Sequence, residues 1–565
     1  MLLIVNAAIA QNGSLQKNET SKLTIENIFV HVSNTTLIAG ETLHCKLYCL
    51  NSPNNNFSSI SKIAHVELVN KENQSILTAK INLENGTGEG DFFIPATIAT
   101  GSYKLIAYTK WMLNNSDSKV SSTDLILINP YTTNSDKINN SKDVTNNFEA
   151  KSNSGSYALE VNKKFFAKRE QVSISLKSVN SMNTKGNFSL SVKKKDNLPS
   201  QKQMNSNEFA AYNSGLQTTL KEQLSFLPEL RGEIISGTIT NNKDPKQVAG
   251  KNVALSLPGD NFAFKIAKTN SEGKFNFILD KSPNYSNAVI QVTGEDKNDY
   301  TVEIDKANVY NLKNTTSSEE LSLSFDYKAG IEERSVASQI ENAYYTSKKD
   351  SLQPDVKTVP FYNPLLEREY ILEDYTKFPS LKETITEVVK EAYYREENKN
   401  FTLHVRDINY DLKFFAEPAL ILVDGLMIQN SNELVDYKME NVYKISLVPG
   451  VYVYGPKAFD GIISFTTKNG DYITKEKGSH ILKTEIQRPL NKTICFKPDY
   501  TNTNKYDRIP DYRHQLLWEP ELSLEGLEKT ISFFTSDVPG IYEINLEGFT
   551  NNGTPVSLKE SFEVK

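Results

Sequence analysis

The chain has 565 residues, too many for a single hydrophobic core, and its length favours roughly three to five domains. The formal net charge is -6 at pH 7, and lysine and arginine are spread along the sequence rather than gathered in blocks, which gives no reason to expect nucleic acid as a partner. Hydrophobic residues make up 38% of the chain. After the first residues, no run approaches the roughly 20 apolar residues of a membrane helix.

The chain opens with "MLLIVNAAIAQNGS", where a short apolar run precedes the small-x-small pattern "AIA". This pattern is typical of a secretory signal peptide. We therefore predict a signal peptide over residues 1–10, cleavage between Ala10 and Gln11, and an exported protein. No cysteine lies beside the predicted cleavage site, so we expect no lipid anchor.

Residues 23–130 alternate apolar and polar side chains with a period of two, between turns rich in Asn, Gly, Ser and Pro. This pattern is typical of an antiparallel β-sandwich. In "ETLHCKLYCL", Cys45 and Cys49 fall on the apolar face of one strand, about 13 Å apart and beyond disulfide reach. We expect both to be free core thiols, and Cys495 completes no disulfide framework.

A polar tract over residues 131–156 is predicted to be a mobile linker, because it has few apolar side chains to bury. Alternation returns in residues 157–197, which we predict to be a partial or second β-sandwich. There "EQVSISL" repeats the local pattern of "ETLHCKL", which favours a duplicated module. Residues 232–304 show the same alternation and are predicted to be a small all-β domain.

The first helix that the sequence indicates lies in "FPSLKETITEVVKEAYYREE". Ser380 is placed to be its N-cap with Glu383 three residues later, and we expect the helix to run from Leu381 to Tyr394. Strands "NFTLHVRDI" and "PALILVDG" follow, so residues 370–475 are predicted to form a mixed α/β domain in which the helix covers one face of a sheet.

Residues 498–565 alternate again and are predicted to be a C-terminal β-sandwich. In its strand "YEINLEG", we expect Tyr542, Ile544 and Leu546 to face inward and Glu543, Asn545 and Glu547 to face outward. The expected fold class is therefore mainly β, with tandem immunoglobulin-like β-sandwiches and one small α/β domain.

Three segments resemble known families. "AGETLHCKLY" and "GTGEGDFFIPATIATGSYKLIAYTKWMLN" resemble the second macroglobulin-type (MG2) domain of the alpha-2-macroglobulin family. "ISGTIT", "VALSL" and "TNSEGKFNF", within 232–304, resemble a carboxypeptidase regulatory-like domain. "EPALILVDG", "VYKISLVPG" and "VYVYGPKAFDGIISFTTKNG", within 370–475, are similar to the plug of TonB-dependent receptors. The combination resembles secreted proteins of Bacteroidota.

The plug-like segment is expected to fold without a receptor barrel. Plugged receptors have about 22 strands of roughly 9 to 11 residues each, and the sequence after Gly470 is too short for them. The tail "PGIYEINLEGFTNNGTPVSLKESFEVK" also bears a faint likeness to the sorting domain of type IX secretion cargo, with an ordinary terminal sandwich as the alternative.

We predict no catalytic residue, no cofactor and no metal site. The sequence has no Gly-x-Ser-x-Gly elbow and no zinc-protease helix motif, and its six histidines are scattered. The Gly-Cys-Gly-Glu-Gln thioester block of the macroglobulin family is absent, and Cys495 stands in "KTICFKPDY". We expect the glycines of "NGTGEGDFF" and the pair Asp424-Gly425 to make turns, and Gly455 and Gly461 to need tight backbone geometry.

These features favour a non-catalytic binding or scaffold protein of the bacterial cell envelope, with envelope or outer-membrane proteins as partners. The protein would lie in the periplasm, at the outer membrane or on the cell surface. The alternatives are an accessory component of TonB-linked nutrient uptake, a thioester-less macroglobulin-type protease inhibitor, and an envelope hydrolase using carboxylates such as Glu373, Asp374 and Asp424. A deep cleft with pKa-perturbed carboxylates or histidines would favour the hydrolase.

Overall fold

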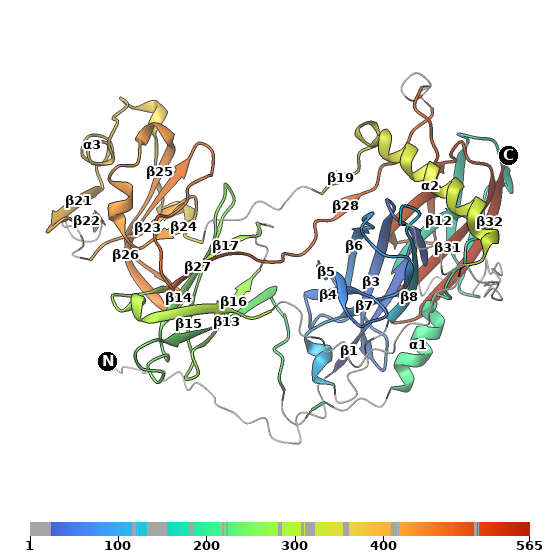
Figure 1. The fold of residues 1–565 in the computed structure, drawn as a ribbon, viewed down its shortest axis with the longest axis horizontal. Coiled ribbons are helices and arrows are strands. Elements are labelled where there is room, and N and C mark those ends of the chain that lie inside the picture. Colours follow the sequence, from blue (N-terminus) through green and yellow to red (C-terminus); the bar gives the residue numbers. More distant parts are fainter. Residues whose placement is uncertain are drawn as a thin grey trace. The chain divides into compact units, whose positions relative to one another are not determined.

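The computed structural model describes residues 24–115, 120, 122–132, 155–179, 185–216, 220–221, 224–280, 285–306, 310, 323–353, 361–407, 415, 417–501, 506 and 508–565. The chain forms two compact units (Figure 1). Unit 1 comprises Met1–Leu230, Val309–Gln353 and Leu490–Lys565, and unit 2 comprises Arg231–Asn308 and Pro354–Pro489. The predicted cleavage site at Ala10 and Gln11 and most of the predicted linker over 131–156 lie outside the described residues.

The first β-sandwich of unit 1 consists of two sheets with the strand orders β1-β3-β6 and β2-β8-β7-β4-β5. Its strands are β1 (Ile25–Val32), β2 (Thr36–Ile38), β3 (Thr42–Ser52), β4 (Ile63–Val69), β5 (Ser75–Asn82), β6 (Thr87–Phe93), β7 (Gly101–Tyr108) and β8 (Ser122–Ile128). Cys45 and Cys49 lie on β3, fully buried in the core of this sandwich, and both are free thiols, as the alternation predicts.

The second β-sandwich of unit 1 joins strands from distant parts of the chain. Its sheets have the orders β30-β11-β9 and β10-β32-β31-β12-β29. The strands are β9 (Tyr157–Val161), β10 (Phe165–Phe166), β11 (Gln171–Ser178), β12 (Gly186–Lys194), β29 (Gln515–Leu524), β30 (Glu528–Phe534), β31 (Gly540–Thr550) and β32 (Pro555–Val564). Figure 1 shows β12 beside the red strand β31.

This arrangement favours the partial sandwich over the second complete one for 157–197, and it corrects the prediction that 498–565 forms a C-terminal β-sandwich by itself. Strand β12 pairs with both β29 and β31, and one core contains apolar residues from both stretches. The physical reason is that the earlier stretch supplies only part of two sheets, and a sheet face must be buried against another layer to be stable. The two stretches therefore fold together.

The two sandwiches of unit 1 pack against each other across a polar layer. The Tyr48 hydroxyl of β3 donates to Ser189 Oγ at 2.9 Å and to the carbonyl oxygen of Glu547 at 3.1 Å. The prediction that Glu543, Asn545 and Glu547 face outward is wrong for Glu547, which is buried, and the other two are half-buried. The alternation in β31 separates its two faces correctly, but the face that carries Glu547 packs against the first sandwich and is not exposed to water.

Unit 1 also contains two helices that the sequence pattern does not indicate, α1 (Ser206–Gly215) and α2 (Lys328–Ala343). A capping box between Asn205 and Glu208 begins α1. The buried residues of α2 are Arg334, Ser335, Ala337 and Ser338. Because the buried face of α2 consists of small or polar side chains, the helix lacks the apolar stripe by which an amphipathic helix is recognised.

Two short strands, β19 (Ser351–Leu352) and β28 (Thr493–Ile494), pair with each other in unit 1.

Both units contain short 3-10 turns. These lie at Trp111–Asn114, Lys297–Asp299, Phe325–Tyr327, Tyr345–Ser347, Pro364–Leu366, Leu372–Asp374, Ser431–Leu434 and Met439–Asn441.

Unit 2 contains a third β-sandwich with the sheet orders β16-β13-β18 and β15-β14-β17-β27. Its strands are β13 (Glu233–Asn241), β14 (Asn252–Leu257), β15 (Ala263–Lys268), β16 (Lys274–Leu279), β17 (Asn287–Thr293), β18 (Tyr300–Ile304) and β27 (Ile481–Glu485). Strand β27 lies beyond the range 232–304 that the sequence indicates for this domain, and it adds an edge strand next to β17.

The mixed sheet of unit 2 has the order β20-β25-β26-β23-β24, with β23 and β26 parallel. Its strands are β20 (Arg368–Ile371), β23 (Leu420–Val423), β24 (Leu426–Ile428), β25 (Val442–Tyr454) and β26 (Lys457–Thr467). Helix α3 (Leu381–Glu387) packs its apolar residues into the same core as one face of this sheet, as predicted. Ser380 and Glu383 form the predicted capping box.

The predicted length of α3 is wrong, because the helix ends at Glu387 instead of Tyr394. Strand β21 (Ala392–Glu397) follows and pairs with β22 (Asn400–Val405). The two residues between these strands, Asn398 and Lys399, both have positive φ, at 52° and 65°. A two-residue turn of this kind matches the twist of a hairpin, and the aromatic and β-branched residues on either side favour strands.

The pair Asp424-Gly425 makes the predicted turn between β23 and β24, with φ values of 51° and 82°. Replacing Gly425 with Ala is expected to lower the free energy of unfolding of unit 2. A Cβ there would lie 2.1 Å from Phe262 Cγ in addition to the strain of positive φ. We expect the positive φ to lower the free energy of unfolding by about 1–2 kcal/mol, and the overlap with the Phe262 ring to lower it by about 1–3 kcal/mol more. Urea unfolding measures the total loss.

The control is Gly250→Ala, since Gly250 has a φ of 73° but a Cβ there would meet only Lys268 Cε, at 3.4 Å. Gly250→Ala should therefore show only the loss of stability that comes from placing alanine at a positive φ. Equal losses in the two variants would contradict the role assigned to Phe262.

Candidate functional site

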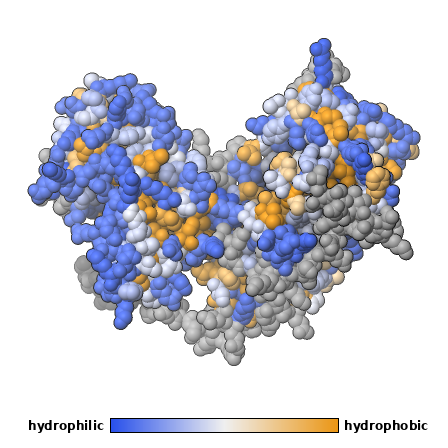
Figure 2. All heavy atoms as spheres, viewed as in Figure 1, coloured by the Kyte–Doolittle hydropathy of each residue, from blue (hydrophilic) through white to orange (hydrophobic). Residues whose placement is uncertain are grey.

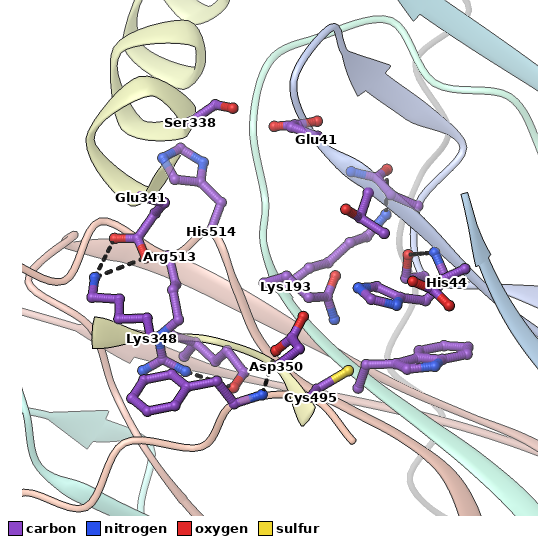
Figure 3. A pocket seen from close by; sticks show the side chains of 18 of the residues that line it. Glu41, His44, Lys193, Ser338, Glu341, Lys348, Asp350, Cys495, Arg513 and His514 are labelled. Atoms are coloured by element: carbon purple, nitrogen blue, oxygen red, sulfur yellow. Dashed lines mark hydrogen bonds and ion pairs between the residues drawn. The ribbon is translucent and has the colours of Figure 1, made fainter. Parts of the chain in front are cut away.

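A cavity of about 1210 Å³ lies in unit 1, lined by residues of both sandwiches, of α2 and of the β19–β28 pair (Figure 3). Its lining residues fall within the stretches 33–93, 193–196, 334–352 and 493–518. Ligand pockets usually enclose roughly 300–1,000 Å³, so this one is large enough for a sizeable ligand or a segment of another protein.

Helix α2 is held beside the cavity by the buried guanidinium of Arg334. This group donates two hydrogen bonds to the Glu41 carboxylate, at 2.8 and 2.7 Å, and one to Asp196 at 2.9 Å. It also donates to the carbonyl oxygen of Thr36 at 2.8 Å. Burial acts against its charge, but the two carboxylates prevail and raise the pKa of Arg334 above its ordinary value. Arg334 therefore joins α2 to segments from both sandwiches.

Further along the cavity, Lys348 and Glu341 form a second ion pair. The Lys348 ammonium donates to both oxygens of the Glu341 carboxylate, at 2.7 and 2.8 Å, and to the carbonyl oxygen of Pro510. Glu341 also accepts a hydrogen bond from the backbone N–H of Tyr512 at 2.6 Å. These contacts hold the segment after α2 against the chain that leads into β29.

Two histidines line the cavity, and both are kept in their neutral form. Burial lowers the pKa of His44 to about 4, with Asp350 opposing that change. Burial also lowers the pKa of His514 to about 4, assisted by the positive charge of Arg334. Neither ring nitrogen of His514 has a hydrogen-bond partner among the described residues. His44 stacks on the Trp518 ring, with ring centroids 6.1 Å apart.

Cys495 also lines the cavity, with Asp350 and Asp91 nearby. In Figure 3, Asp350 and Cys495 lie between the side that carries Lys348 and the side that carries Lys193 and His44. Burial, followed by the negative charges of Asp350 and Asp91, raises the pKa of the Cys495 thiol to about 12. The thiol is therefore protonated at neutral pH, whereas a nucleophilic or metal-binding cysteine needs its thiolate.

The cavity has apolar side chains that remain exposed to solvent. Phe93, Tyr345 and Leu352 line it, and they are 58%, 51% and 62% exposed. Figure 2 shows more generally that apolar residues on the visible face gather in patches among hydrophilic ones. Exposed large apolar side chains at a concave surface are typical of a contact site for another molecule.

The three carboxylates named above as candidates for a hydrolase lie in unit 2. Asp424 accepts hydrogen bonds from the backbone N–H and the hydroxyl of Thr467, both at 2.7 Å. Glu373 lies 3.8 Å from the Lys468 ammonium in an exposed ion pair. These contacts give Asp424 a role in holding the turn after β23 and give Glu373 a partner at the surface. Asp374 follows Glu373 in the 3-10 turn Leu372–Asp374.

The described residues contain no group of three or more His, Cys, Asp or Glu side chains that is arranged to hold a metal ion. Within the same part of the chain, no helix combines the length and apolar character needed to cross a membrane. His44, Asp350, Cys495 and His514 come from separate stretches of the chain and no local motif connects them, so their meeting in one cavity is not predictable from the sequence pattern.

No family model and no curated protein matches the sequence. Among solved structures, the chain is similar to an alpha-2-macroglobulin of Salmonella reacted with methylamine, with 10% identity, a TM-score of 0.24, and coverage of 95% of this chain and 39% of that one. An Escherichia coli alpha-2-macroglobulin activated by porcine elastase has the same identity and TM-score, with coverage of 95% and 44%. A Listeria innocua β-glucosidase in complex with isofagomine reaches 13% identity and a TM-score of 0.13 over 18% of this chain and 16% of that one.

The chain thus spans about two fifths of the length of these macroglobulins. At such identities and TM-scores the likeness gives no information about activity. The mainly β fold with tandem sandwiches, which the sequence predicts, is confirmed by the sheets of the chain itself.

Proposed function

We propose that this chain is a non-catalytic binding or scaffold protein of the bacterial cell envelope, exported from the cytoplasm, which holds a segment of a partner protein in the unit 1 cavity. The observation that supports it best is the combination of exposed Phe93, Tyr345 and Leu352 with the ion pairs of Arg334 and Lys348. Exposed apolar side chains anchor a partner, and paired charges hold the cavity walls in place.

The titratable groups of the cavity also favour binding over catalysis. A general acid or base works best with a pKa near the operating pH. Here burial lowers the pKa of His44 and of His514 to about 4 and raises that of Cys495 to about 12. These side chains are therefore neutral near pH 7, which suits polar and apolar contacts with a bound chain more than proton transfer.

The test uses tagged full-length protein incubated with detergent extracts of the cell envelope, followed by cross-linking and mass spectrometry. Wild type is expected to retain a partner in a fixed stoichiometry, and Phe93→Asp combined with Leu352→Asp should lower its retention at least tenfold. Leu527→Asp is the control, because Leu527 is 58% exposed in unit 1 and does not line the cavity.

Retention of the same partner by the double variant would disprove the cavity as the binding site. Two other outcomes would replace the proposal. Hydrolysis of an envelope substrate that is lost in Asp350→Asn would favour the hydrolase. A stoichiometric complex with an added endopeptidase would favour a thioester-less protease inhibitor.

A further inference from the structure

We propose that unit 2 carries a separate binding site for a small anion with an unbranched apolar body, such as a medium-chain carboxylate. The site is a pocket of about 470 Å³, between the segment 372–379, helix α3 and the segment 438–442. Its volume is within the range of roughly 300–1,000 Å³ that is usual for small-molecule sites.

The inner part of the pocket is apolar. Val388, Met439 and Val442 are buried members of the unit 2 core, and Leu372 and Phe378 pack against that core. Thr384 also lines the pocket, but its hydroxyl donates to the carbonyl oxygen of Ser380 at 2.9 Å. The inner wall therefore offers a ligand mainly apolar contacts, which suit a hydrocarbon chain.

The mouth of the pocket is charged, with lysines in excess. Lys468 lies 3.8 Å from Glu373, and Lys438 lies 3.7 Å from Glu440, in two exposed ion pairs. Exposed pairs of this kind are weak and exchange readily with other partners. The third lysine, Lys377, has no hydrogen bond or ion pair among the described residues.

These observations determine the class of ligand. With three lysines and two glutamates, the mouth has an excess of one positive charge, which a single anionic group would balance. A ligand that enters with its apolar chain first would fill the inner part of the pocket, and its anionic end would then lie beside Lys377. A cation of the same length would meet the excess charge unfavourably. The site does not depend on the proposed function of unit 1.

The experiment is isothermal titration of the full chain with sodium hexanoate, octanoate and decanoate, below their micelle-forming concentrations. We expect one molecule bound per chain, with affinity rising roughly fourfold for each added methylene until the pocket is full. Added salt should weaken binding, because the lysines at the mouth are exposed to solvent. Decyltrimethylammonium, a cation of similar length, should bind at least tenfold more weakly.

Two variants locate the site. Val388→Trp would fill the inner part of the pocket and should abolish decanoate binding. Lys377→Glu changes an exposed side chain, so it keeps the test valid if Val388→Trp does not fold, and it should weaken binding about tenfold. Lys246→Glu is the matched control, since Lys246 is an exposed lysine of unit 2 outside the pocket and the change should leave binding unaltered.

The absence of saturable binding at millimolar decanoate would overturn the proposal. So would equal affinity for the cationic probe, or unchanged binding by Lys377→Glu together with any folded Val388→Trp protein. Phe93→Asp combined with Leu352→Asp should still bind decanoate, which separates a failure here from a failure of the unit 1 proposal.

Discussion

Replacing Arg334 with Ala is expected to lower the free energy of unfolding of unit 1 by about 3–5 kcal/mol. The Arg334 side chain is 5% exposed and pairs with Glu41 and Asp196, so its removal would leave two partly buried carboxylates without their shared cation. Urea unfolding measures the loss. In Arg334→Ala, the backbone amide hydrogens of α2 should exchange with solvent sooner than those of the sandwiches. The reason is that this guanidinium joins α2 to segments of both sandwiches.

Lys328→Ala provides the control on the same helix. Lys328 is exposed and lies 3.8 Å from Glu332 in an i,i+4 pair, which is worth about 0.5 kcal/mol or less. If Arg334→Ala and Lys328→Ala unfold at the same urea concentration, the Arg334 contacts do not hold α2 in place. Preserved protection of the α2 amides in Arg334→Ala would lead to the same conclusion.

Replacing Glu547 with Gln is expected to stabilise unit 1 at pH 8 by about 3 kcal/mol and to change little at pH 4. Burial raises the pKa of Glu547 from 4.5 to about 7. A carboxyl with a raised pKa favours the folded state below its unfolded pKa, and that contribution is lost as the pH rises through 7. Glutamine stays neutral throughout, so the difference in free energy of unfolding should grow by about 1.4 kcal/mol per pH unit between 4.5 and 7.

The hydrogen bonds of Glu547 are compatible with an amide. One carboxylate oxygen accepts from the backbone N–H of Ser206 and the other from the Ser557 hydroxyl, both at 2.8 Å. An amide oxygen can replace the first, and its NH2 group can donate to the Ser557 hydroxyl oxygen. Burial lowers the pKa of nearby His31 to about 3, but His31 is present in both proteins and its effect cancels.

Urea unfolding of both proteins between pH 4 and pH 8 gives this difference directly. Glu525→Gln, which removes an exposed carboxylate from the same sandwich, serves as the control. A constant difference between wild type and Glu547→Gln across the whole range would show that Glu547 is not a buried acid with a raised pKa.

Local pattern was enough to predict many strands and one helix start. The period-two alternation in β3 predicts that Cys45 and Cys49 share a buried face, and the Ser380–Glu383 pair predicts where α3 begins. Both features depend on neighbours within a few residues of sequence. The end of α3 was predicted wrongly, because the hairpin at Asn398 and Lys399 begins within the expected helix and competes with it.

Features that depend on long-range pairing were not predictable from local pattern. Nothing within β12 indicates that its neighbours are β29 and β31, and nothing around Glu547 indicates a second layer beyond its polar face. Helix α2 is held by a charged side chain rather than an apolar stripe, so hydrophobic periodicity does not reveal it. The unit 1 cavity could not be predicted for the same reason, since it brings together four separate stretches of chain.

The position of β12 also limits the order in which the protein can fold during synthesis. Gln515 Nε2 donates to the carbonyl oxygen of Val192 across 323 residues of sequence, so β12 cannot complete its sheet until β29 and β31, near the end of the chain, have emerged. Until then its two edges have no β29 or β31 to pair with, and unpaired strand edges promote aggregation. Residues 231–308 and 354–489, which make up unit 2, are synthesised within this interval. A chaperone that shields β12 during that time would therefore raise the yield of native protein more than one that acts on the finished chain.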